Sequence, residues 1–162
     1  MVKIHVPEPL ELGTSLSSLV GRTARVRDAD TPHTYDETVH TARYLTRDNR
    51  LAALLQVDLP LAAHLGAALA MMPAAVAEDA IKQNSLDENL IDAYSEVANI
   101  LAGLLCDDAT PHVRWTDLET STARLTEGDK TILEEPCQRI DLNIELDDCG
   151  SGRLTIYTAV LG

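Results

Sequence analysis

The hydrophobic pattern changes its period twice along this chain, and the resulting order of elements constrains the fold more than any other feature. Bulky and polar residues alternate over 22–28, and the segments 38–46 and 51–58 flank a polar turn at 47–50, which predicts a hairpin. Ala-rich segments with helical spacing follow, and alternation returns over 140–147 before a glycine-rich turn and a final strand. Period two is typical of a half-buried strand, and a spacing of three to four is typical of a helix. Strands, two long helices and strands again predict an α+β fold, a mainly antiparallel sheet covered by the two helices.

The 162 residues match the length of one domain, and no linker or low-complexity tract divides them. We therefore expect a single domain over residues 1–162, with residues 1–20 as an N-terminal arm. Within the arm, Leu12, Leu16 and Leu19 have the spacing of one or two helical turns. Because the chain contains no Phe and only 3% aromatic residues, its core has to be built from Leu, Val, Ile and Ala.

The charge balance excludes several classes of partner. Twenty-six acidic residues against thirteen basic ones give a net charge of −13, which repels nucleic acid and anionic membrane surfaces. The three cysteines match no Cys-x-x-Cys pattern, and the first residues lack the apolar core of a signal peptide, so we expect a cytoplasmic protein. Residues 59–77 carry no charge, but Pro73 interrupts them and acidic residues flank them. We expect buried helix there rather than a membrane span.

A capping pattern marks the start of the most informative helix. Ser85-Leu86-Asp87-Glu88 places a serine at the cap and a glutamate three residues later. This spacing predicts one continuous helix over residues 86–105. Its apolar face comprises Leu90, Tyr94, Val97, Leu101, Leu104 and Leu105.

The opposite face of this helix carries a polar stripe, defined here as Asp92, Glu96, Asn99 and Gly103. Any amphipathic helix packed on a sheet presents a polar face to water, and that interpretation requires no function. Two features favour a docking surface instead. Asp92 and Glu96 are like charges four residues apart, which costs roughly 0.2–0.5 kcal/mol. Ala102 and Gly103 keep the end of the stripe flat, although a mid-helix glycine costs about 1 kcal/mol relative to alanine. We predict that another protein docks on Asp92, Glu96, Ala102 and Gly103.

Other chemistry is not indicated by the sequence. The five histidines lack metal-ligand spacing such as His-Glu-x-x-His, so we expect no metal site. No Gly-x-Ser-x-Gly motif and no phosphate-binding glycine loop before a helix is present.

The pattern Asp92-x-x-x-Glu96-x-x-Asn99, followed by residues 100–103 (Ile-Leu-Ala-Gly), resembles the signature helix of the CheC/CheX family of chemotaxis phosphatases. The order of Ala-rich helices before it and of a strand hairpin after it is similar as well, from about residue 38 onward. One copy of the motif is visible, so the single-motif CheX type is closer. The resemblance implies dephosphorylation of a CheY-type response regulator, that is, hydrolysis of its aspartyl phosphate in chemotaxis or related two-component signalling. It also implies a homodimer, for which the terminal hairpin over residues 138–161 offers a sheet edge.

The resemblance assigns roles within the motif. It implies that Asn99 inserts its side-chain amide and orients the attacking water, and that Glu96 pairs with a lysine of the regulator. Asp92 belongs to the motif with a role limited to helix orientation or docking. The regulator carries the phosphoryl group and its own Mg²⁺, so no cofactor of this chain is expected.

One departure from the family pattern leaves an alternative open. The family places a proline well downstream of the Asn, near the start of the following strand. Here Pro111 comes earlier and Pro136 later, while Ser121 and Thr122 occupy that region. The alternative function is therefore a non-catalytic binding module, either a silent CheX-like relative or a small acidic chaperone of the secretion type. A chaperone would expose apolar grooves rather than a polar stripe.

Overall fold

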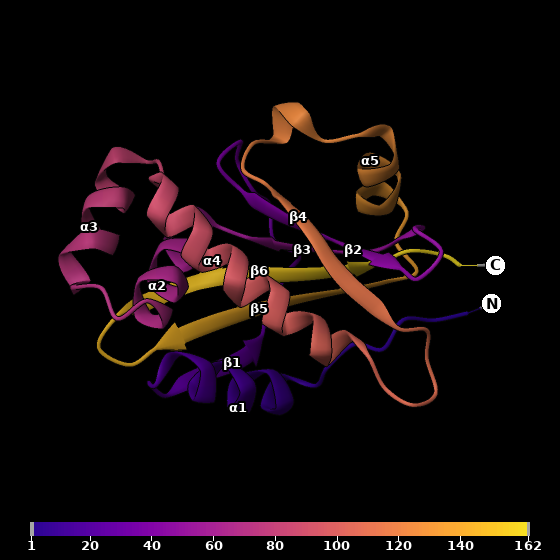
Figure 1. Cartoon of the computed structure of the whole chain (residues 1–162), viewed down its shortest axis with the longest axis horizontal. Coiled ribbons are helices and arrows are strands. Elements are labelled where there is room, and N and C mark those ends of the chain that lie inside the picture. Colours follow the sequence, from indigo (N-terminus) through magenta and orange to yellow (C-terminus); the bar gives the residue numbers. More distant parts are fainter. Residues whose placement is uncertain (1, 162) are drawn as a thin grey trace.

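Six strands form one antiparallel sheet in the part of the chain that the structure, a computed structural model, describes: residues 2–161 (Figure 1). Their spatial order is β1-β5-β6-β3-β2-β4. The strands are β1 (Ala24–Asp28), β2 (His40–Thr46), β3 (Leu51–Val57), β4 (Val113–Glu119), β5 (Gln138–Leu146) and β6 (Gly150–Thr158). The strands expected from alternation are confirmed, and so is the turn between β2 and β3, where Asn49 has a φ of 64°.

Five α-helices accompany the sheet among the described residues. They are α1 (Pro9–Val20), α2 (Leu59–Leu69), α3 (Ala74–Gln83), α4 (Glu88–Leu101) and α5 (Glu127–Glu134). Two short 3₁₀ turns, η1 (Ala102–Leu105) and η2 (Thr122–Arg124), complete the elements. The predicted α+β class is confirmed.

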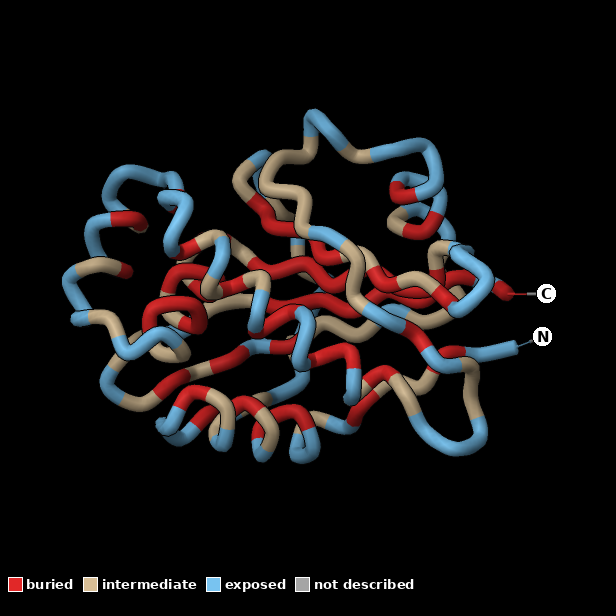
Figure 2. The backbone as a smooth tube through the Cα atoms, in the orientation of Figure 1, coloured by how far each residue is buried: buried red, intermediate tan, exposed pale blue. Residues whose placement is uncertain are grey.

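The two faces of the sheet have different covers. Tyr44 of β2 contacts α4 through its hydroxyl, whereas Arg43, the preceding residue, contacts Asp129 of α5. Because side chains alternate across a strand, α4 and α5 lie on opposite faces. The helices α2 and α4 pack together on the first face, as expected for two long covering helices (Figure 1). Figure 2 shows the buried residues concentrated in the strands and on the inward sides of the helices.

The uncharged segment 59–77 is not one long helix. It contains α2, a break at Met71, which has a φ of 57°, and the start of α3 after Pro73. Pro73 lacks a backbone N–H and cannot continue α2, which explains the break. Within residues 2–161, no helix is both long and apolar enough to cross a membrane.

The N-terminal stretch considered as an arm contains the 12-residue helix α1. Pro9 lies in its first turn, and Gly21 ends it with a φ of 68°, donating its N–H to the Ser17 carbonyl. Leu12 and Leu16 are buried in the core. Residues 9–20 are therefore part of the packed structure rather than a free arm.

The expectation about the sheet edge was wrong. The terminal hairpin β5–β6 lies inside the sheet, because β5 also pairs with β1 and β6 also pairs with β3. The two edge strands are β1 and β4. A β5–β6 edge for pairing with a second copy therefore does not exist in the described chain.

Candidate functional site

The helix that carries the polar stripe begins later than predicted. Its N-cap is Asp87, whose Oδ1 accepts a hydrogen bond from the Leu90 N–H at 2.9 Å, rather than Ser85. Asn84 ends α3 in the left-handed conformation, and its N–H reaches back to the Ala80 and Ile81 carbonyls. Ser85 therefore belongs to the connection between two helices, which leaves the capping position to Asp87.

The helix also ends differently from the prediction of one helix over residues 86–105. The α-helix stops at Leu101 and tightens into η1. The Ala102 N–H bonds to the carbonyls of Asn99 and Ile100 instead of that of Ala98. The Ala98 carbonyl accepts a 2.7 Å hydrogen bond from the Tyr44 hydroxyl instead, so the orphaned acceptor is satisfied from the sheet.

The polar stripe reaches solvent as predicted. Asp92, Glu96, Asn99 and Gly103 are all exposed. Within residues 2–161, none of the three polar side chains makes a hydrogen bond or ion pair, so their polar atoms are available to a partner. Ala102 does not belong to this surface: it is 9% exposed and packs in the core, which corrects its assignment as a docking residue.

Next to the stripe lies an apolar residue that the sequence did not single out. Ile100 is 43% exposed although it is a large hydrophobe. It follows Asn99 directly, at the last turn of α4. Its signal in the sequence was weak, since a lone isoleucine near a helix end is equally compatible with burial. Polar groups beside an exposed apolar side chain form a small surface suited to a protein partner.

Two contacts fix the position of α4 on the sheet. Gly66 of α2 lies so close that an added Cβ would stand 3.1 Å from the Leu90 carbonyl oxygen and 3.2 Å from the Tyr94 nitrogen. The Tyr44 hydrogen bond holds the other end, one residue before Asn99. Buried apolar side chains, Val97 among them, fill the space between. The close approach of α2, the Tyr44 hydrogen bond and the buried apolar side chains together set the position of the stripe.

A pocket of about 270 Å³ adjoins the beginning of α4. Ser121, which lies where the family pattern expects a proline, lines it together with His40, Leu86 and Ile91. His40 is 3% exposed, and its Nδ1 has no hydrogen-bond partner among the described residues. Burial lowers the pKa of His40, because charging the ring in this environment is unfavourable.

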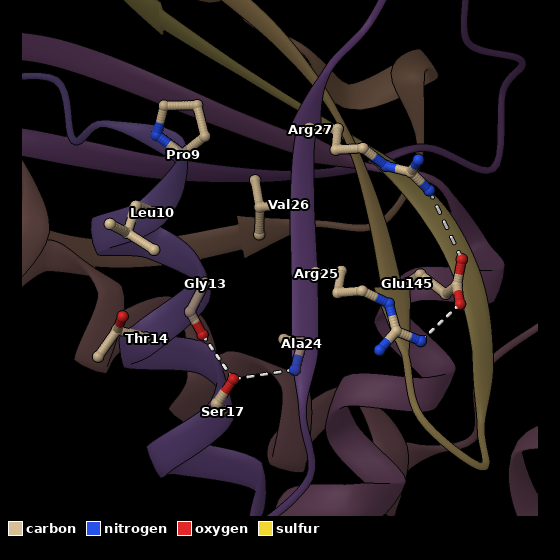
Figure 3. Close-up of a pocket in the computed structure, with 10 residues that line it drawn as sticks. All are labelled: Pro9, Leu10, Gly13, Thr14, Ser17, Ala24, Arg25, Val26, Arg27 and Glu145. Carbon is tan, nitrogen blue, oxygen red and sulfur yellow. Dashed lines mark hydrogen bonds and ion pairs between the residues drawn. The ribbon is translucent and has the colours of Figure 1, made fainter.

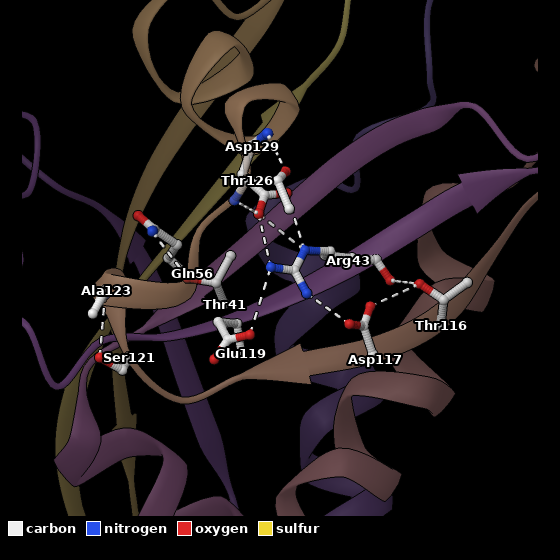
Figure 4. Close-up of polar contacts among 10 residues, drawn as sticks. All are labelled: Thr41, Arg43, Gln56, Thr116, Asp117, Glu119, Ser121, Ala123, Thr126 and Asp129. Carbon is white, nitrogen blue, oxygen red and sulfur yellow. Dashed lines mark hydrogen bonds and ion pairs between the residues drawn. The ribbon is translucent and has the colours of Figure 1, made fainter.

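A charged cluster on the other face of the sheet holds α5 in place (Figure 4). Arg43 donates to both carboxylate oxygens of Asp129 at 2.8–3.0 Å and to Asp117 at 2.6 Å. Burial by itself raises the pKa of Asp129, but hydrogen bonds from Arg43 and from the Thr126 backbone outweigh it, and the pKa is lowered. Thr126 and Asp129 also form a capping box at the start of α5. This cluster is a structural anchor, because its acids are engaged by Arg43.

No group of three or more His, Cys, Asp or Glu side chains that could hold a metal ion occurs between residues 2 and 161. The polar stripe, which is exposed and makes no hydrogen bond within residues 2–161, is the candidate site. It offers carboxylates and one amide at helical spacing, groups that can bind a cation or position a water molecule but cannot act as a nucleophile of the serine or cysteine type.

The comparisons with known proteins bear on the fold. No protein-family model matches the sequence, and no curated protein matches it. Among solved structures, CheX of Borrelia burgdorferi, solved in a complex with CheY, BeF₃ and magnesium, has a TM-score of 0.55 at 10% identity. That match covers 93% of this chain and 95% of the other. Thermotoga maritima FliY has a TM-score of 0.56 at 14% identity, covering 91% and 82%. A chain of the FliG–FliM complex from H. pylori has a TM-score of 0.55 at 13% identity, covering 93% and 86%.

These similarities extend over nearly the whole chain. At 10–14% sequence identity they are evidence for the fold alone. They agree with the resemblance first seen in the motif of α4. The chain has the fold shared by CheX, FliY and the middle domain of FliM.

Proposed function

We propose that this protein docks through the exposed face of α4 on a phosphorylated CheY-type receiver domain and hydrolyses its aspartyl phosphate. One observation carries the proposal: Asp92, Glu96 and Asn99 lie exposed and unpaired in a row on a helix whose other face is fixed in the core. The fold supports the choice of partner, because CheX with this fold was solved in complex with CheY.

Hydrolysis of an aspartyl phosphate demands little covalent chemistry from the phosphatase. Phosphoryl transfer depends mainly on positioning and on electrostatic stabilisation. The receiver contributes the phosphoryl group and a divalent metal ion, so this chain needs no cofactor for the step. It has to hold one water molecule in line with the phosphorus and to keep other water out.

Asn99 is the residue proposed to position that water. An amide cannot act as a base at neutral pH, so its contribution is geometric: the side-chain carbonyl accepts from the water and fixes its direction of attack. The Tyr44 hydrogen bond to the preceding carbonyl supports this role, since it fixes the backbone from which Asn99 projects.

Glu96 is proposed to pair with a lysine of the receiver, which sets how deeply Asn99 is inserted. Ile100 then covers the rim of the contact with apolar surface. Asp92, one turn before Glu96, adds charge that orients a basic rim on the partner during docking. Gly103 is exposed, and nothing beyond its own turn lies within 4 Å of where its Cβ would be, so the surface there is open to a partner.

The alternative, a binding module without catalysis, has a specific observation in its favour. Ser121 stands where the family pattern has a proline, and FliM, which shares the fold, was solved in complex with FliG. In that case α4 would dock without accelerating hydrolysis.

We also propose a homodimer, in which the contact between the two copies lies elsewhere than at the β5–β6 hairpin. Since β5 and β6 are internal, a second copy would pair through an outer element such as the edge strand β4. The proposed receiver partner places the protein in the cytoplasm. Light scattering over a range of concentrations tests the dimer, and a strict monomer would contradict it.

The test of the function is phosphate loss from a panel of receiver domains phosphorylated with a small phosphodonor in the presence of magnesium. The proposal predicts that the wild-type chain accelerates loss from at least one receiver above that receiver's own rate. If a receiver binds α4 with no acceleration, the binding-module function replaces the phosphatase. If no phosphorylated receiver binds, the phosphatase function is wrong, and a binding module would have to take a partner other than a receiver.

A further inference from the structure

A groove opens between helix α1 and the edge strand β1 (Figure 3). At one end the two elements touch: the Ser17 Oγ accepts from the Ala24 N–H at 2.9 Å, and a Cβ on Gly13 would stand 3.3 Å from the Ala24 carbonyl oxygen. Toward Pro9 and Arg27 a cavity of about 570 Å³ separates them. This volume lies within the roughly 300–1,000 Å³ of ligand pockets.

The wall formed by β1 offers unpaired backbone groups. Thr23 and Ala29, which flank the strand, hydrogen bond to the β5 side at 3.0 and 2.9 Å. Inward and outward residues alternate in an antiparallel ladder, so Ala24, Val26 and Asp28 turn their N–H and C=O groups away from β5. Within residues 2–161, β5 is the sole strand paired with β1. The N–H and C=O of Val26 therefore face the groove.

The side chains around this edge are apolar on one side and basic on the other. The Val26 side chain packs close to Gly13 of α1: a Cβ on Gly13 would lie 3.5 Å from Val26 Cγ2. Leu10, at the mouth of the groove, is 81% exposed. Arg27 leaves the strand on the side opposite to Val26, and its side chain is 75% exposed. Its ion pair with Glu145 has a separation of 3.8 Å, so the guanidinium retains capacity for a second carboxylate.

The strand that pairs with β1 on its inner edge, β5, shows which side-chain pattern fits beside the arginines of β1. Residues 145–147, at the end of the neighbouring strand β5, are acidic, apolar and acidic in turn, and Arg25 binds Glu145 and Asp147 at 2.8 and 2.5 Å. Opposite charges directly across neighbouring strands are stabilising by roughly 0.2–1 kcal/mol. An outer strand of the same pattern would meet Arg27 in the same way.

We propose that the groove binds an extended acidic–apolar segment of another protein, which adds to the sheet as a strand beside β1. An apolar residue of the segment lies opposite Val26 and against Leu10, and an acidic neighbour lies opposite Arg27. Main-chain hydrogen bonds supply affinity in this mode, and alternate side chains supply specificity.

A second copy of this chain is a poorer occupant. Antiparallel pairing of two β1 strands about Val26 would set Arg25 of each copy directly opposite Arg27 of the other. Like charges in that position are destabilising. The β4 strand of a second copy carries acidic residues, but Asp117 and Glu119 already contact Arg43 of their own chain. They are therefore poor partners for Arg27.

The probe for this site is a labelled eight-residue peptide in which valine alternates with aspartate, and the matched control has lysine in place of aspartate. Fluorescence anisotropy is expected to show one-to-one binding of the aspartate peptide and at least about tenfold weaker binding of the lysine peptide. Arg27→Glu is expected to reverse the preference. Leu10→Ala weakens binding, whereas Met71→Ala, at an 89% exposed site elsewhere, does not. Equal binding of the two peptides would overturn the proposal.

Two valine variants separate strand addition from general charge attraction. Val26→Pro removes an outward N–H without removing a bond to β5, a position where edge strands tolerate proline, and it should abolish binding. Val26→Thr keeps the N–H and should bind like the wild type. Loss of binding by Val26→Pro could also come from a disturbed fold. Hydrogen exchange of the wild-type Val26 amide therefore provides a second measurement. Slowed exchange in the peptide complex supports strand addition, and unchanged exchange contradicts it. Concentration-dependent self-association through β1 without peptide would identify a second copy as the occupant and overturn the choice of partner.

Discussion

The phenol of Tyr44 donates a 2.7 Å hydrogen bond to the carbonyl of Ala98, across the boundary between the sheet and helix α4. Tyr44 is fully buried, and burial raises the pKa of its hydroxyl, so it remains a donor at physiological pH. The bond satisfies the one carbonyl that the change from α-helix to η1 leaves without its usual partner. It couples the core of the sheet to the backbone next to Asn99.

Replacing Tyr44 with Phe removes this bond and leaves the Ala98 carbonyl buried without a donor. The expected cost is about 1–3 kcal/mol in the free energy of unfolding, measured by urea denaturation. Phosphate release should fall as well, because Asn99 loses its backbone anchor. Tyr157→Phe is the matched control: its hydroxyl donates a 2.9 Å bond to Gln56, remote from α4, so a similar loss of stability should leave phosphate release unchanged. Equal effects of both variants on release would contradict the coupling.

Two glycines of the α2–α4 region should respond in opposite ways to alanine. Gly66→Ala places a Cβ 3.1 Å from the Leu90 carbonyl oxygen and forces the helices apart, at a cost of about 1–3 kcal/mol. Gly103→Ala meets nothing beyond its own turn within 4 Å and should stabilise the fold by about 0.5–1 kcal/mol. Thermal or chemical denaturation distinguishes them. A stable Gly66→Ala protein would show that the helices do not need this close approach.

The acid stability of the protein should depend on Asp129. Its folded-state pKa is lowered below the ordinary value of 3.8, so its stabilising contribution is complete above that pH. The contribution is lost as the pH falls below 3.8 toward the folded-state pKa, because protonation breaks the pair with Arg43. Asp129→Asn should cost about 3 kcal/mol at neutral pH and flatten the decline in stability below pH 3.8.

Asp117→Asn is the control for this effect. Its carboxylate contacts the same guanidinium at 2.6 Å, but its side chain is 54% exposed. The expected loss is at most about 1 kcal/mol, as for other surface ion pairs. Urea denaturation at a series of pH values measures both variants. An Asp129→Asn protein with the acid profile of the wild type would contradict the assignment.

Local pattern was sufficient for the elements that use one face consistently. The strict alternation over 140–146 predicted β5, and the apolar repeat from Leu90 to Leu101 predicted α4 and the solvent exposure of its polar stripe. The end of α4 was not predictable from local pattern, because the Ala98 carbonyl at the change to η1 bonds to the hydroxyl of Tyr44, more than fifty positions away in the sequence.

Helix α5 was missed for a related reason. It has eight residues and is mostly polar, and one of its two buried residues is Asp129. Asp129 is buried because Arg43, on a distant strand, neutralises it, and no local pattern records that pairing. The order of strands was equally hidden: nothing within the C-terminal hairpin indicates that β1 and β3 flank it. Helix α1 was underestimated as well: one or two turns within an arm were expected, and the structure has a 12-residue helix from Pro9 to Val20.

The most direct test of the account compares wild type with Asn99→Ala on a phosphorylated receiver domain with magnesium present, by the rate of phosphate release. The account predicts acceleration by the wild type and a loss on the order of 10²–10³ in turnover for the variant, by analogy with removal of one preorganised polar group. Asn143→Ala, an exposed amide on β5, should retain full activity, and both variants should unfold like the wild type. If wild type and Asn99→Ala release phosphate at the same rate, the proposed role of α4 in catalysis is contradicted.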